Sequence, residues 1–76
     1  MTAYYVTSPT RRERRQVYSN RPLAVYGYIV PAGSSGYQIQ VGDEFVPADA
    51  PTTGETFPSL RSAKAAILAA HGIDAV

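Results

Sequence analysis

The segment from Pro58 to Ile73 carries the one long amphipathic helix pattern in the chain, and the rest of the fold has to cover its apolar side. Ser59 stands before the periodic run and predicts an N-cap, because its hydroxyl can accept a hydrogen bond from an N–H group of the first turn. Gly72 predicts the left-handed residue that follows the helix, after which Ile73 folds back on the last turn. The sequence thus predicts a helix over residues 59–71.

The apolar face of this helix is narrow and rich in alanine. Its members recur at the spacing that places side chains on one side of a helix. They are Leu60, Ala63, Ile67 and Ala70. Small side chains allow close approach to a second layer, so we expect a sheet to lie under the helix.

Two runs in the middle of the chain predict the strands of that sheet. Residues 23–30 are rich in aliphatic and aromatic side chains, and residues 37–41 alternate strictly between apolar and polar. If residues 31–36 close a regular hairpin, one set of side chains faces the helix and a second set forms the outer face. The first set is Tyr26, Tyr28, Val30, Tyr37, Ile39 and Val41. The second set is Val25, Gly27, Ile29, Gln38 and Gln40.

A third strand is predicted over residues 44–46, after the turn signal Gly42-Asp43. The direction of Phe45 depends on the length of that turn. A two-residue loop places its ring on the outer face, and a three-residue loop with a bulge places it inside. We favour the second, because burial of a phenylalanine stabilises by roughly 1.5–3 kcal/mol.

The N-terminal part of the chain is basic and the remainder is acidic. Residues 1–21 hold five arginines and one glutamate, a net charge of +4, whereas residues 22–76 hold two basic and five acidic side chains, a net charge of −3. Residues 3–7 predict an edge strand. Thr10 and Glu13 match a capping box, which allows a short helix over roughly residues 11–18. A mobile arm is the alternative.

These observations predict a single α+β domain of 76 residues. Three or four antiparallel strands pack on one C-terminal helix, preceded by a basic N-terminal segment over residues 1–22. We expect an antiparallel meander over 23–47, a loop over 48–58 and the helix over 59–71.

The composition argues against an enzyme. The chain has no cysteine and one histidine, so neither a thiolate metal site nor a nucleophile–base pair can be assembled. His71 falls at the end of the predicted helix, where a capping role is expected. We therefore expect no catalytic residues, no cofactor, no metal and no small-molecule substrate. A membrane span and a secretion signal are also missing, so we expect a cytoplasmic protein or one held in an assembly.

The hydrophobic pattern of residues 23–71 resembles small modules built from a three-stranded sheet and a helix. It runs through Tyr26-x-Tyr28, Tyr37-x-Ile39-x-Val41, Phe45 and Phe57-x-Ser59-Leu60-x-x-Ala63-Lys64-x-x-Ile67. The arm-type DNA-binding domains of tyrosine integrases and the APETALA-type domains of plants are similar. The resemblance implies a sheet whose open face enters the major groove, although the strands here lack the basic residues of those families. In size and residue usage the chain also resembles accessory proteins of actinobacterial phages.

Two surfaces are predicted to bind a macromolecule. The basic cluster supplies Arg11, Arg12, Arg14, Arg15 and Arg21. The outer sheet face supplies Val25, Ile29, Gln38 and Gln40. Guanidinium groups suit carboxylates and phosphates, so the partner is a protein or a nucleic acid. We favour a protein, with a second copy of the chain as one option, and keep a DNA-binding regulator as the alternative. A solvated basic segment without a partner also explains the arginines.

Overall fold

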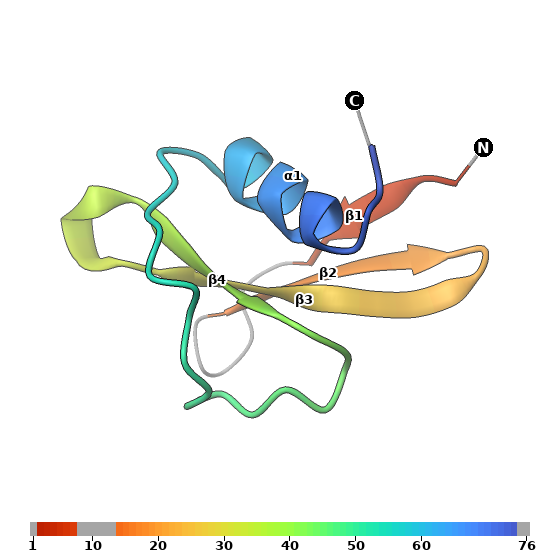
Figure 1. The fold of residues 1–76 in the computed structure, drawn as a ribbon, viewed down its shortest axis with the longest axis horizontal. Helices are drawn as coiled ribbons and strands as arrows, with labels where there is room; N and C mark the ends of the chain where they lie inside the picture. Colours follow the sequence, from red (N-terminus) through yellow and green to blue (C-terminus); the bar gives the residue numbers. More distant parts are fainter. Residues whose placement is uncertain (1, 8–13, 75–76) are drawn as a thin grey trace.

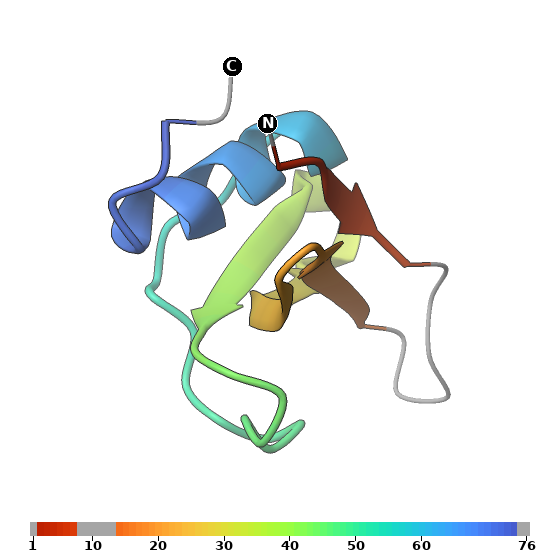
Figure 2. The same ribbon diagram turned by 90° about the vertical axis from the view of Figure 1, so that its right-hand side faces the viewer.

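The computed structural model describes residues 2–7 and 14–74, which form one antiparallel sheet with a helix across one face (Figure 1). The strands are β1 (Tyr4–Val6), β2 (Arg15–Asn20), β3 (Leu23–Pro31) and β4 (Tyr37–Val41), and the helix is α1 (Leu60–Ala70). Each strand pairs with the next in chain order. Figure 2 shows the same arrangement from the side, with β1 at the sheet edge. The predicted α+β class is confirmed, with four strands.

The predicted ends of the helix are confirmed. The Ser62 N–H donates to Ser59 Oγ at 3.1 Å, and the Ser59 N–H donates to Ser62 Oγ at 3.2 Å, which completes a capping box. At the other end Gly72 adopts a φ of +75°, and the Ile73 N–H donates to the Leu68 carbonyl at 3.0 Å. This closure turns Ile73 back onto the core, as the sequence predicts.

The core lies between α1 and the inner face of the sheet. It consists of Val17, Ile29, Ile39, Ala63, Ile67 and Leu68. Gly27 lies under the helix, where an added Cβ would stand 3.1 Å from Ile67 Cγ2 and 2.4 Å from the Gln40 carbonyl oxygen. The backbone of β4 therefore excludes a side chain at position 27, and Ile67 of α1 packs tightly over the same position.

The predicted register of the β3–β4 hairpin is wrong by one residue on β3. Pro31 pairs with Tyr37 and Ile29 pairs with Ile39, because Pro31 continues the strand and a short 3-10 turn over Gly33–Ser35 closes the loop. A shift of one residue exchanges the two faces of a strand. Ile29 and Gly27 therefore face the helix, and Ile29 is only 1% exposed.

A bulge between β2 and β3 keeps Tyr26 on its predicted side. Val17 pairs with Gly27 and Tyr18 pairs with Val25, so Tyr26 is the extra residue on β3. Its ring packs against the core, and its hydroxyl lies 3.0 Å from Ser19 Oγ. The inner face is consequently a mixture of aliphatic and tyrosine side chains.

Of the two elements predicted in the N-terminal part of the chain, the strand is confirmed and the helix is wrong. The edge strand is confirmed as β1. A helix reaching residue 18 is wrong, because residues 15–18 belong to β2, which pairs on both sides and buries Val17 and Ser19 alternately. A mobile arm is likewise wrong for residues 15–18, and Thr10 and Glu13 of the predicted capping box lie outside the described residues.

The third strand predicted over residues 44–46 does not form. The chain turns away from the sheet at Asp43, whose Oδ1 accepts from the Phe45 N–H at 2.9 Å. Phe45 lies in this turn and is 80% exposed, so the favoured inward direction of its ring is wrong, and the strand that both directions assumed is absent. The edge of β4 pairs instead with the chain before the helix, since Tyr37 and Phe57 exchange backbone hydrogen bonds of 2.8 and 2.7 Å.

Candidate binding surface

The outer face of the sheet, opposite α1, is covered over part of its area by the segment that follows β4. Figure 1 shows this segment passing on the side of the sheet away from the helix. Gln40 Nε2 donates to the Ala48 and Ala50 carbonyls at 3.2 and 2.9 Å, and Tyr28 OH donates to the Glu44 carbonyl at 3.0 Å. Gln40 is 2% exposed as a result.

Arg14 fastens the same segment to the sheet. Its guanidinium stacks over the Tyr28 ring, 3.7 Å from the centroid. Nη1 donates to Gln40 Oε1 and Nη2 donates to the Val46 carbonyl, each at 2.8 Å. All of these partners belong to the fold, so this guanidinium holds the covering segment in place.

The structure therefore places the predicted binding residues in different environments. Arg11 and Arg12 lie outside the described residues. Arg15 Nη1 donates to the Thr7 carbonyl at 3.2 Å, so its guanidinium, like that of Arg14, contacts groups of the same chain. Ile29 is in the core and Gln40 is under the covering segment, so their prediction as an exposed docking face is wrong. Gln38 is half-buried, and its Oε1 accepts a hydrogen bond from the Thr52 hydroxyl at 3.3 Å. Val25 is half-buried on the outer face.

The remainder of the outer face carries tyrosine and aliphatic side chains that the covering segment does not hold. The register places Tyr5 beside Tyr18, Tyr18 beside Val25, and Asn20 beside Leu23. The rings of Tyr5 and Tyr18 lie 5.5 Å apart at an angle of 35°. Tyr5 is 44% exposed and Leu23 is 81% exposed. We call these five residues the tyrosine surface.

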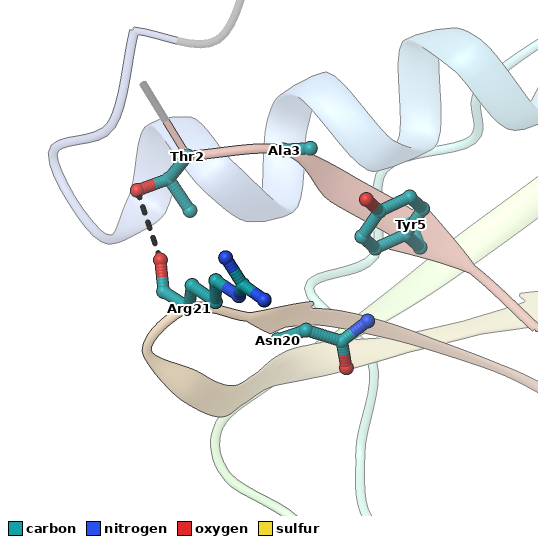
Figure 3. A pocket seen from close by; sticks show the side chains of 5 residues that line it. All are labelled: Thr2, Ala3, Tyr5, Asn20 and Arg21. Carbon is teal, nitrogen blue, oxygen red and sulfur yellow. Dashed lines mark hydrogen bonds between the residues drawn. The ribbon is translucent and has the colours of Figure 1, made fainter.

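A hollow opens at the edge of the tyrosine surface. Its lining residues are Thr2, Ala3, Tyr5, Asn20 and Arg21, and its volume is about 380 Å³. Thr2 Oγ1 donates to the Arg21 carbonyl at 3.3 Å, which ties the start of the chain to the β2–β3 turn. Figure 3 shows the Arg21 guanidinium, the Asn20 amide and the Tyr5 ring bordering the same space. Of the predicted binding arginines that the structure describes, Arg21 is therefore the one that lies at an open surface.

Sequence reasoning missed most of this surface. Tyr5, Tyr18 and Leu23 come from three strands, and only the strand pairing brings them together. The high tyrosine content was the available signal, since the chain holds six tyrosines and no tryptophan. Tyrosine favours positions where one ring face is buried and the hydroxyl stays in water.

His71 has the structural role predicted for it. It is the C-cap of α1, its ring packs edge-on against Tyr26 with centroids 5.3 Å apart, and its Nε2 lies 2.7 Å from the Tyr26 carbonyl oxygen. Within residues 2–7 and 14–74, no group of three or more histidine, cysteine or acidic side chains could hold a metal ion. No helix in the described part of the chain is long and apolar enough to cross a membrane.

The chain matches no protein-family model, and neither a curated protein nor a solved structure is significantly similar to it.

Proposed function

We propose that this chain is a non-enzymatic binding module that docks another protein on the tyrosine surface. The observation that carries the proposal is the exposure of Tyr5 and Leu23 on a sheet face that is covered elsewhere by its own chain. Tyrosine and arginine, which this surface and its edge supply, are among the residues enriched at the centres of protein interfaces.

The arginine contacts favour a protein over a nucleic acid. Binding to a nucleic-acid backbone needs several cations that are free to meet phosphates. The guanidiniums of Arg14 and Arg15 contact Gln40, Val46 and Thr7 of the same chain. The alternative of a DNA-binding regulator that uses Arg11 to Arg15 consequently loses two of its four contacts.

A comparison of two surface variants tests this proposal. The double substitution Tyr5→Ser and Leu23→Ser removes the exposed part of the tyrosine surface, and Phe45→Ser removes a similarly exposed ring outside it. Each tagged variant is incubated with nuclease-treated lysate of native host cells, and the captured proteins are identified by mass spectrometry. We expect the double variant to lose the specifically captured protein and Phe45→Ser to retain it.

Two results would contradict the proposal. One is equal capture by the double variant and the wild-type chain while both remain folded. The other is capture that occurs in untreated lysate and disappears when the lysate is treated with nuclease, which would point to a nucleic acid. If the captured protein is the chain itself, sedimentation of the wild type and the double variant will report a self-association that the two substitutions abolish.

A further inference from the structure

We propose that the hollow beside Arg21 is a carboxylate-binding site, which receives an acidic side chain or a terminal carboxylate of the docked protein. The identity of the docked molecule as a protein rests on the proposed function above. The chemistry of the site rests on its own lining residues, Thr2, Ala3, Tyr5, Asn20 and Arg21.

The lining presents hydrogen-bond donors and one positive charge. Arg21 offers a planar set of N–H groups, Asn20 offers an amide, and Tyr5 offers a hydroxyl. No acidic residue lines the hollow, and within the described residues the Arg21 guanidinium has no hydrogen bond or ion pair. An ionised carboxylate only accepts hydrogen bonds, so it matches this lining, whereas an ammonium group would meet Arg21 as a like charge.

The position of Arg21 is set by the backbone around it. The residue lies in the turn between Asn20, the last residue of β2, and Leu23, the first residue of β3, and these two residues pair. The Thr2 hydroxyl holds its carbonyl from the other side. A guanidinium on a fixed backbone loses less freedom when it forms two parallel hydrogen bonds to a carboxylate, the geometry in which arginine exceeds lysine.

The neighbouring tyrosine surface adds a second requirement for the ligand. Tyr5 belongs to the hollow and to the tyrosine surface, so the two are continuous. A carboxylate bound by Arg21 would place an adjacent apolar side chain over the Tyr5 and Tyr18 rings. The favoured ligand is therefore a peptide position where a carboxylate adjoins an apolar or aromatic residue. A phosphate backbone is disfavoured, because among the described residues Arg21 is the cation that lines the hollow, and a single cation does not follow a row of phosphates.

An NMR titration with small probes tests the site. N-acetylphenylalanine carries a terminal carboxylate beside a ring, N-acetylphenylalaninamide is its neutral counterpart, and N-acetylglutamylphenylalaninamide carries a side-chain carboxylate beside a ring. Inorganic phosphate and hexathymidylate represent phosphate ligands. We expect the two carboxylates to shift the amide signals of Thr2, Tyr5, Asn20 and Arg21, and the neutral amide to bind about tenfold more weakly or worse. The stronger of the two carboxylates then identifies the source of the ligand.

Variants at two arginine positions test whether Arg21 supplies the positive charge that binds the carboxylate. Arg21→Gln should weaken carboxylate binding by about tenfold, whereas Arg61→Gln, which removes an exposed charge on α1, should leave it within about twofold. Arg21→Lys should fall between them, because it keeps the charge and loses the planar pair of donors. The amide spectrum of each variant reports whether the fold is kept, and Arg21→Lys decides the result if Arg21→Gln does not fold.

Three results would overturn the assignment. They are equal binding of the neutral amide, binding that does not depend on Arg21, and tighter binding of phosphate or hexathymidylate than of either carboxylate. The absence of binding by every probe would also overturn it. These failures are distinct from a failure of the proposed function, since the Tyr5 and Leu23 double variant would still lose its protein partner if docking used the tyrosine surface without Arg21.

Discussion

Arg14 illustrates why a cluster of charges in a sequence is a poor guide to the role of each member. The sequence predicts a basic patch, and guanidinium chemistry fits an external carboxylate or phosphate. In the fold, Arg14 is half-buried and meets Tyr28, Gln40 and the Val46 carbonyl. None of these partners is close to it in sequence, so only the completed sheet and its covering segment reveal the role.

Removal of the Arg14 side chain should loosen the covering segment. Arg14→Ala leaves Gln40 Oε1 and the Val46 carbonyl without their donor and removes a cation–π contact. We expect a loss of about 1.5–3 kcal/mol in unfolding free energy and faster amide exchange over residues 44–50. Urea denaturation and hydrogen exchange measure the two effects. Arg61→Ala, on the exposed side of α1, serves as control, and equal stability of the two variants would show that Arg14 does not hold the segment.

At the scale of elements, local signals predict the ends of the helix and long-range pairing decides the strands. Ser59 and Gly72 mark the helix because capping depends on residues within one turn. The faces of β3 depend on whether Pro31 joins the strand and on a bulge opposite Val17. Neither is visible in an alternating pattern. The alternating pattern of residues 37–41 did give β4 its bounds, since that strand has no bulge.

The packing of β3 against β4 and α1 should tolerate no side chain at position 27. In Gly27→Ala the new methyl group would lie 2.4 Å from the Gln40 carbonyl oxygen, which belongs to the backbone of the paired strand and cannot rotate away. We expect a loss of about 1–3 kcal/mol from overpacking, and a larger loss in Gly27→Val. Thermal and urea unfolding of the two variants give the comparison. A change below about 0.5 kcal/mol in Gly27→Ala would mean that the backbones of β3 and β4 move apart easily at this position.

For the whole molecule, the sequence predicts the class and the helix-on-sheet packing but not the outer surface. The class follows from one amphipathic helix and alternating strands, whose apolar sides must meet. The fate of Phe45 shows the limit. Its burial would stabilise the chain, yet Asp43 turns the backbone away before a third strand can pair, and the ring remains exposed. The tyrosine surface depends on two strand pairings that join three strands, and it could not be assembled from local patterns.

A domain of this size should depend strongly on each large core residue. Ile67 is fully buried at the centre of the helix face. Ile67→Ala should cost about 2–4 kcal/mol, a large part of the roughly 5–15 kcal/mol that holds a small domain together. Ile67→Val should cost about 0.5–1.5 kcal/mol in the same urea titration. If both substitutions were neutral, the core would have to lie elsewhere than between α1 and the sheet.

The placement of α1 after the strands has a consequence for synthesis on the ribosome. Val17, Ile29 and Ile39 have all been polymerised before the residues that cover them, because Ile67, Leu68 and Ile73 come later in the chain. At about 5–20 residues per second, the interval between the last residue of β4 and Ile73 is roughly two to six seconds. Until the residues of α1 can pack on the strands, the strands have no layer to cover their apolar side, which is the kind of surface that chaperones bind.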